Sequence, residues 1–198
     1  ITEESVDPDG DAVDYRYTWM RNGTVVLDGE TSVVSEELTS KGDVWRLTVT
    51  PTDGLSEGTP REVEVIIGNS PPQLLSSTLS PDPADTTDDF TCAYSGESDW
   101  DGDTVSVMTA WFVNEELLPV TTTELDKAWT RRDDQVYCEV TPHDGFTSGS
   151  TIRSNVVTVE NSAPYVLAVF IDPAAVRSGD RPACIYLGFN DPDGDDDA

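Results

Sequence analysis

Basic residues are scarce in this chain, whose 198 residues include 11 Lys and Arg against 39 Asp and Glu, for a formal net charge of -28. Such a surface repels phosphate backbones, which excludes nucleic acid as a partner. Long apolar runs are also lacking, and none approaches the roughly 18 residues that predict a membrane-spanning helix. Hydrophobic residues still make up 36% of the chain, with five Trp and six Tyr, which is enough to build packed cores.

Catalytic side chains are equally scarce. The only histidine is His143, and the chain has no phosphate-cradling glycine motif, nucleophile elbow or histidine-based zinc pair. Thr52 takes the place of His143 in an earlier copy of the same turn, so this turn does not need an imidazole. We therefore expect that the protein is not an enzyme.

What the chain does contain is an acidic five-residue motif that recurs at a constant interval. DPDGD at residues 7–11 returns as DWDGD at 99–103 and as DPDGD at 191–195, each time 92 residues further on. A period of this length corresponds to one small domain, so the sequence predicts a tandem array. We expect a first repeat at 1–70, a complete second repeat at 71–162 and the first strands of a third at 163–198, with both ends cutting through a domain.

Linkers and loops repeat together with the motif. NSPP at 69–72 returns as NSAP at 161–164, again 92 residues later. After a one-residue deletion the offset becomes 91, so the TPTDG stretch that contains Asp53 matches the TPHDG stretch that contains Asp144. The prolines in the two linkers favour extended backbone, which predicts connections with few flexible states.

Alternation of apolar and polar residues predicts strands, and no segment has sustained helical periodicity. In the first repeat, residues 13–19 alternate and are followed by the turn sequence Asn22-Gly23. Further strands are predicted at 45–49, 63–67, 105–111, 136–140 and 157–159. Short strands separated by Gly and Pro turns predict an all-β fold class of antiparallel β-sandwiches strung end to end.

The second repeat contains Cys92, Trp111 and Cys138 in that order. This order resembles the immunoglobulin-like superfamily, in which strands B and F of a Greek-key sandwich are joined by a disulfide and a Trp on strand C packs on the bond. More narrowly, the whole chain is similar to the bacterial tandem Ig-like, PKD-like and cadherin-like repeats of large secreted or surface proteins.

The resemblance implies a disulfide between Cys92 and Cys138, and with it an extracellular or cell-surface location, because such bonds persist in oxidising compartments. The alternative is that the two are small buried thiols. The first repeat has Leu47 where the second has Cys138, so we expect no bond there. Cys184 aligns with Cys92, and we expect its partner to lie beyond Ala198.

The three aspartates of each motif indicate a cation site. Carboxylates at alternate positions repel one another unless a cation offsets their charge, and ligands that are all oxygen suit Ca²⁺ better than zinc or copper. The motif is not an EF-hand, because its Gly is at position 4 rather than 6. The alternative is that Asp and Gly simply form a tight turn.

In an Ig-like sandwich, the B–C and F–G loops lie at the end where the chain enters, so the resemblance groups each motif with the TPxDG loop and the linker. The candidate calcium ligands form three sets: Asp7, Asp9 and Asp11 with Asp53; Asp99, Asp101 and Asp103 with Asp144 and Asn69; Asp191, Asp193 and Asp195 with Asn161. Linker oxygens in a calcium shell would fix the angle between repeats. A further acidic segment at 80–89 is interpreted as a solvated loop.

These observations predict a calcium-stiffened extracellular array of structural repeats, either the stalk of a surface adhesin or a subunit of a cell-surface filament. Its partners would be other repeats of the same or a neighbouring chain, without membrane insertion. In the filament version, residues 165–189 complete the first domain of a neighbouring molecule by donor-strand assembly; in the simpler version the chain is an excerpt of a longer polypeptide. The rival hypothesis is an accessory module of a secreted enzyme that binds carbohydrate or protein through exposed aromatics such as Trp100.

Overall fold

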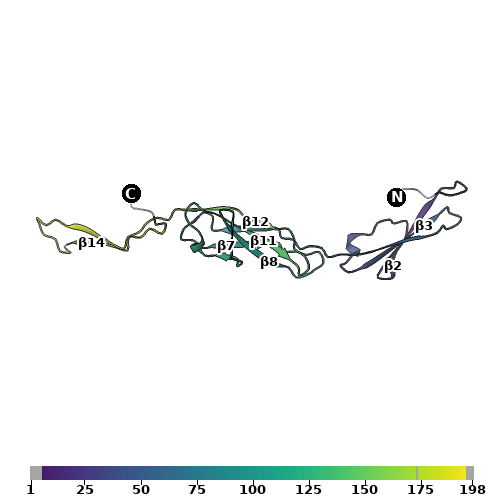
Figure 1. Ribbon diagram of the computed structural model, residues 1–198, viewed down its shortest axis with the longest axis horizontal. Helices are drawn as coiled ribbons and strands as arrows, with labels where there is room; N and C mark the ends of the chain where they lie inside the picture. Colours follow the sequence, from purple (N-terminus) through teal and green to yellow (C-terminus); the bar gives the residue numbers. More distant parts are fainter. Residues whose placement is uncertain (1–5, 173, 195–198) are drawn as a thin grey trace. The chain divides into compact units, whose positions relative to one another are not determined.

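The computed structural model describes residues 6–172 and 174–194 and is nearly all-β (Figure 1). The only helical elements in these ranges are two short 3₁₀ turns, η1 (Glu36–Leu38) and η2 (Lys127–Trp129). The chain divides into two compact units, residues 1–70 with 100–102, and residues 71–99 with 103–198. Of the candidate ligands, Asp195 lies outside the described residues.

The first unit contains one antiparallel sheet of four strands in the order β2-β1-β3-β4. The strands are β1 (Asp14–Arg21), β2 (Thr24–Gly29), β3 (Val44–Thr52) and β4 (Arg61–Ile66). β1, β3 and β4 match the segments 13–19, 45–49 and 63–67 whose alternation predicts strands, whereas β2 was not among the predicted strands. Asn22 and Gly23 form the β1–β2 turn with φ of 50° and 81°, the left-handed conformation that a tight hairpin turn requires.

The side chain of Asn22 also fixes the start of β3. Its Oδ1 accepts the Val44 N–H at 2.9 Å, and its Nδ2 donates to Asp43 Oδ1 at 2.8 Å. The second unit repeats this arrangement with Asn114, Asp134 and Gln135. Asparagine at this place is therefore a structural residue of the hairpin turn in both units.

The second unit contains two sheets. The smaller has the order β10-β7-β5, with β5 (Ser76–Ser80), β7 (Phe90–Ser95) and β10 (Glu124–Leu125). The larger has the order β6-β13-β11-β8-β9, with β12 paired to β11; its strands are β6 (Ala84–Asp85), β8 (Ser106–Val113), β9 (Glu116–Leu118), β11 (Gln135–His143), β12 (Ile152–Arg153) and β13 (Val157–Glu160).

One pairing departs from the antiparallel pattern, because β6 runs parallel to β13. β6 lies inside the acidic segment 80–89, and its Ala84 is buried in the core. That segment is therefore part of the larger sheet as well as a surface connection.

Both sheets of the second unit share one core around Trp111. This side chain is 0% exposed, and its Nε1 donates to the Thr122 carbonyl oxygen at 2.8 Å. The disulfide that the resemblance implies is present, and it joins Cys92 on β7 to Cys138 on β11 with an S–S distance of 2.02 Å. The remaining large buried side chains of this core are Leu79, Phe90, Leu125, Val136, Val140, Val157 and Val159.

The sheet of the first unit has no second sheet against it among the described residues. Val65 is 56% exposed, whereas its equivalent in the second unit, Val157, is 1% exposed. Trp19 contacts the buried Trp45 edge to face at a centroid distance of 6.2 Å, and it remains partly exposed, unlike Trp111. The apolar pattern is thus the same in both units, and what differs is the layer that covers it.

A two-stranded hairpin, β14 (Ala168–Asp172) and β15 (Ala183–Leu187), completes the described structure. Its register reproduces that of β5 and β7 at an offset of 92 residues: Ile171 pairs with Cys184 as Leu79 pairs with Cys92. Cys184 is free and exposed.

Loss of the disulfide is expected to destabilise the second unit by about 4 kcal/mol, because the bond closes a loop with a sequence separation of 46. The variant is Cys92→Ala combined with Cys138→Ala, compared with the unchanged chain by urea unfolding. Cys184→Ser is the matched control and should leave the transition in place. Equal midpoints and slopes for all three proteins would contradict the expectation.

Candidate metal site

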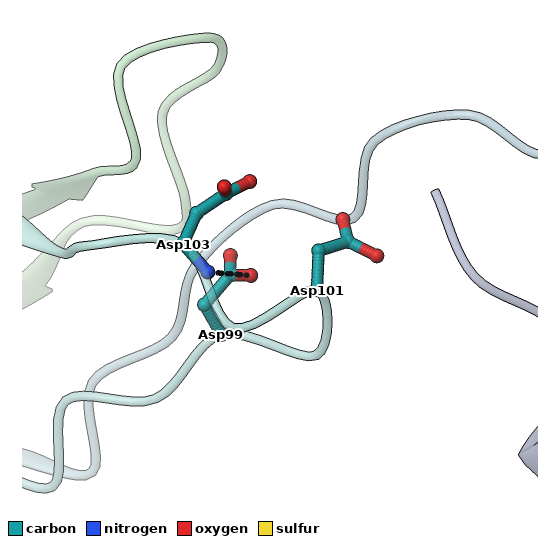
Figure 2. A group of neighbouring side chains, drawn as sticks. All are labelled: Asp99, Asp101 and Asp103. Atoms are coloured by element: carbon teal, nitrogen blue, oxygen red, sulfur yellow. Dashed lines mark hydrogen bonds between the residues drawn. The ribbon is translucent and has the colours of Figure 1, made fainter. Parts of the chain in front are cut away.

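Three carboxylates come together in the loop that follows β7. One oxygen from each of Asp99, Asp101 and Asp103 lies within 4.8 Å of the other two, and all three residues are partly buried. Figure 2 shows the three side chains leaving this short loop on the same side. Gly102 allows the turn with its φ of +78°, a conformation that a residue with a Cβ adopts only with strain.

The first aspartate of each motif organises the loop backbone. Asp99 Oδ1 accepts the Asp103 N–H at 3.2 Å, and Asp7 Oδ1 accepts the N–H groups of Asp9 at 2.8 Å and Asp11 at 3.3 Å. In the third copy the Asp191 Oδ1 accepts the Asp193 N–H at 2.9 Å. A tight turn therefore accounts for the first Asp and the Gly, but it does not by itself require carboxylates at the third and fifth positions.

The middle aspartate holds the linker. Asp101 Oδ2 accepts the backbone N–H of Ser70 at 2.6 Å. The same contact occurs 92 residues later, where Asp193 Oδ2 accepts the N–H of Ser162 at 2.7 Å. Asp193 also accepts the hydroxyl of Thr86, from the acidic segment that contains β6. The acidic loop and the linker are thus bonded in the same way at two places in the chain.

Sequence reasoning missed Ser70, Ser162 and Thr86. It selected the preceding asparagines, Asn69 and Asn161, whose side-chain amides donate to the carbonyl oxygens of the serines that follow them, at 2.9 and 2.8 Å. The recurrence of Asn-Ser in both linkers was the available signal. The contact with the loop uses a backbone N–H, which any residue except Pro supplies.

The aspartates of the TPxDG loops cap their own turns. Asp144 is buried, and its Oδ1 accepts the N–H groups of Phe146 and Thr147, both at 2.7 Å. Asp53 makes the same pair of contacts with Ser56 and Leu55, and these donors lower the pKa of the Asp53 carboxyl below its usual value. At Asp53 these contacts favour the ionised carboxylate over the protonated form.

The three sets of candidate ligands differ in how closely the structure places their side chains. Among residues 6–172 and 174–194, the only group of three mutually close metal-ligand side chains is Asp99, Asp101 and Asp103. Asp144 is not a member of this group, and the loop that contains Asp7, Asp9 and Asp11 does not form one. The most compact candidate site is therefore the single loop of the second motif.

His143 has a structural contact that explains why Thr can replace it. Its Nδ1 accepts the Gly145 N–H at 2.8 Å. In the first unit, the Thr52 hydroxyl oxygen accepts the Gly54 N–H at 3.1 Å. The imidazole and the hydroxyl thus make equivalent contacts with equivalent turns.

In comparisons with known proteins, neither a family model nor a curated protein sequence matches the chain. The described residues include no helix with the length and apolar character that a membrane span takes. The disulfide is the one structural feature that bears on location, and it favours an oxidising compartment.

Replacement of His143 by Thr is expected to leave the fold intact, because the hydroxyl can accept the Gly145 N–H as Thr52 accepts that of Gly54. Thermal melting checks this, with His143→Ala as the comparison that removes the acceptor. We expect His143→Thr to melt with the unchanged chain and His143→Ala to melt lower. A His143→Thr melting temperature as low as that of His143→Ala would show that the imidazole has a further role.

Proposed function

We propose that this chain is part of an extracellular array of Ig-like β-sandwich repeats in which aspartate loops bind Ca²⁺ next to the linkers. The observation that carries the proposal is that Asp101 contacts both the other carboxylates and the linker. Its carboxylate belongs to the compact group of three, and it also accepts the N–H of linker residue Ser70. A cation bound by this group would be coupled directly to the linker backbone.

The chemistry of the group favours a hard cation. Three carboxylates within 4.8 Å of one another repel strongly when all are ionised, and partial burial weakens the screening by water. Ca²⁺ binds about six to eight oxygens at roughly 2.3–2.6 Å, so three aspartates supply part of a shell, which backbone oxygens and water would complete. The group contains no nitrogen or sulfur ligand of the kind that structural zinc sites use.

The linker contact gives the cation a mechanical role. The two prolines that follow Ser70 restrict the linker backbone. The hydrogen bond from the Ser70 N–H to Asp101 restricts the same backbone further. Cation binding would hold the Asp101 carboxylate in place. The expected consequence is a narrower range of linker conformations when Ca²⁺ is bound.

The repeat architecture has its own support. The second unit has two sheets on one core, with the Cys92–Cys138 bond beside Trp111, as an Ig-like sandwich requires. Two observations support the same domain in successive copies. The strand pairs β5–β7 and β14–β15 have the same register. Asn22 and Asn114 each accept the N–H of the residue that begins the following long strand. The net charge of -28 is also suited to a chain that is partly neutralised by bound cations.

The binding test compares Asp103→Asn with Asp133→Asn by calorimetric Ca²⁺ titration. Asp103 belongs to the close group, whereas Asp133 is an exposed turn aspartate outside it. We expect Asp103→Asn to weaken binding at this loop about tenfold or more, the equivalent of about 1.4 kcal/mol. Asp133→Asn should bind like the unchanged chain. Absence of Ca²⁺ binding by the unchanged chain, or an equal loss in both variants, would contradict the proposal.

The mechanical test is small-angle scattering of the unchanged chain with Ca²⁺ and with a chelator. Removal of the ion should broaden the distribution of dimensions, while circular dichroism reports unchanged strand content. Binding without any change in dimensions would retain the metal site and remove its stiffening role.

The rival function, an accessory binding module, is favoured by one observation: Trp100, inside the acidic loop, is 79% exposed. An exposed indole can stack on a sugar ring. Glycan binding that disappears in Trp100→Ala would support this rival, whereas calcium-dependent dimensions without glycan binding support the structural array.

A further inference from the structure

The linker at 161–164 is contacted by a basic side chain of the second unit as well as by an acidic loop. Arg132, in the turn between η2 and β11, donates from Nη1 to Asn161 Oδ1 at 2.9 Å. Asn161 in turn donates from Nδ2 to the carbonyl oxygen of Ser162 at 2.8 Å. The Asn161 carboxamide is therefore held at both of its polar atoms, by Arg132 and by the linker backbone.

The next linker residue is bonded to the loop of the third acidic motif. Ser162 is 4% exposed, and Asp193 Oδ2 accepts its N–H at 2.7 Å. The other carboxylate oxygen, Asp193 Oδ1, accepts the hydroxyl of Thr86, and Thr86 Oγ1 lies 2.7 Å from Ser162 Oγ. Both oxygens of Asp193 thus accept hydrogen bonds from the protein itself.

Positive charge gathers beside these contacts. Arg132 and Asp193 line the same surface cleft, together with Lys127 and Arg131, so three of the 11 basic residues of this acidic chain lie at one place. A guanidinium carries five N–H donors in a rigid fork, so Arg132 can hold an amide oxygen and still attract a nearby carboxylate. Asp133 lies 3.7 Å from Arg132 Nε, but its side chain is 87% exposed, and water weakens such a pair.

We propose that Arg132 is a positioning residue that fixes this linker without Ca²⁺. By holding the Asn161 side chain, it keeps the Ser162 N–H against Asp193. Asn161 Oδ1, a candidate calcium ligand by its place in the sequence, accepts a hydrogen bond from Arg132 instead. Every contact involved is made by the chain itself, so this role goes beyond the proposed function and does not rest on it. Absence of Ca²⁺ binding at the second motif would leave it standing.

The first linker has a different basic residue at the equivalent position. Lys41 in TSKGD matches Arg132 in TRRDD at an offset of 91. An ammonium is a compact point charge on a flexible stem and lacks the planar fork of a guanidinium. The positioning role is therefore specific to the second linker, and protection of the Ser162 amide should be independent of Ca²⁺ whatever the ion does at Ser70.

The first test is amide hydrogen exchange at Ser162, measured by NMR in a chelator for the unchanged chain, Arg132→Ala and Arg131→Ala. Arg132→Ala should speed exchange about threefold or more, because loss of the contact with Asn161 lets the linker open more often. Arg131→Ala removes the same charge from the neighbouring residue and should leave the rate unchanged. Equal rates in the three proteins, equal increases in both variants, or slow exchange of the unchanged chain only after Ca²⁺ is added would overturn the proposal.

The second test asks whether Arg132 acts through Asn161, and it uses a double-mutant cycle with the same exchange measurement. Asn161→Ala should speed exchange at Ser162. Arg132→Ala added to Asn161→Ala should then have a smaller effect than Arg132→Ala alone, because the contact is already lost. A role of Arg132 in general stability would make the two effects multiply in full, and that result would overturn the proposal.

Discussion

A β-sheet with one apolar face is stable in water only when a second layer covers that face, and the second unit meets this requirement with its smaller sheet. In the second unit the cover is the β10-β7-β5 sheet; Trp111 and Cys138 are buried beneath it, and Cys138 is bonded to Cys92 of the covering sheet. In the first unit the same alternation forms a sheet whose order β2-β1-β3-β4 corresponds to β9-β8-β11-β13, yet Val65 is exposed. The alternating pattern therefore predicts the sheet, and the covering layer decides how far the apolar face of that sheet is buried.

The acidic loops contact the connecting segments of the chain through hydrogen bonds. These contacts are polar and do not use apolar side chains. Instead, the middle aspartate of the motif accepts a linker N–H at two places, Ser70 and Ser162. Such charge-assisted hydrogen bonds are stronger than neutral ones, and they orient the carboxylate. Under the proposed function, a cation bound by this loop would make the connection more rigid.

Much of the fold could be predicted from the sequence, because burial of one face leaves a period of two in the residues. The alternation at 13–19, 45–49 and 63–67 corresponds to β1, β3 and β4, and the disulfide that the Ig-like resemblance implies is present. β6 was not foreseen, since its Ala84 pairs with Val159, a residue 75 positions further along the chain, inside a segment whose composition is typical of a loop.

The sequence predicted which residues form the candidate site, but it did not predict which atoms make the contacts. The spacing of the motif identifies Asp99, Asp101 and Asp103 as one group, and the structure brings their carboxylates together. Sequence could not assign the separate roles within the motif, because those roles depend on backbone N–H groups of the loop and of Ser70. Backbone donors have no signature in the sequence, so the linker contact could be seen only in the structure.

The central claim is that the acidic loop holds the linker and binds Ca²⁺ with the same carboxylates. The most direct measurement is amide hydrogen exchange at Ser70 by NMR, with Ca²⁺ and with a chelator, with the amide of Ser162 as the equivalent position in the next linker. The account predicts that both amides are protected without the ion, and that Ca²⁺ increases protection at Ser70 by making the loop more rigid. Rapid exchange at Ser70 under both conditions would contradict it.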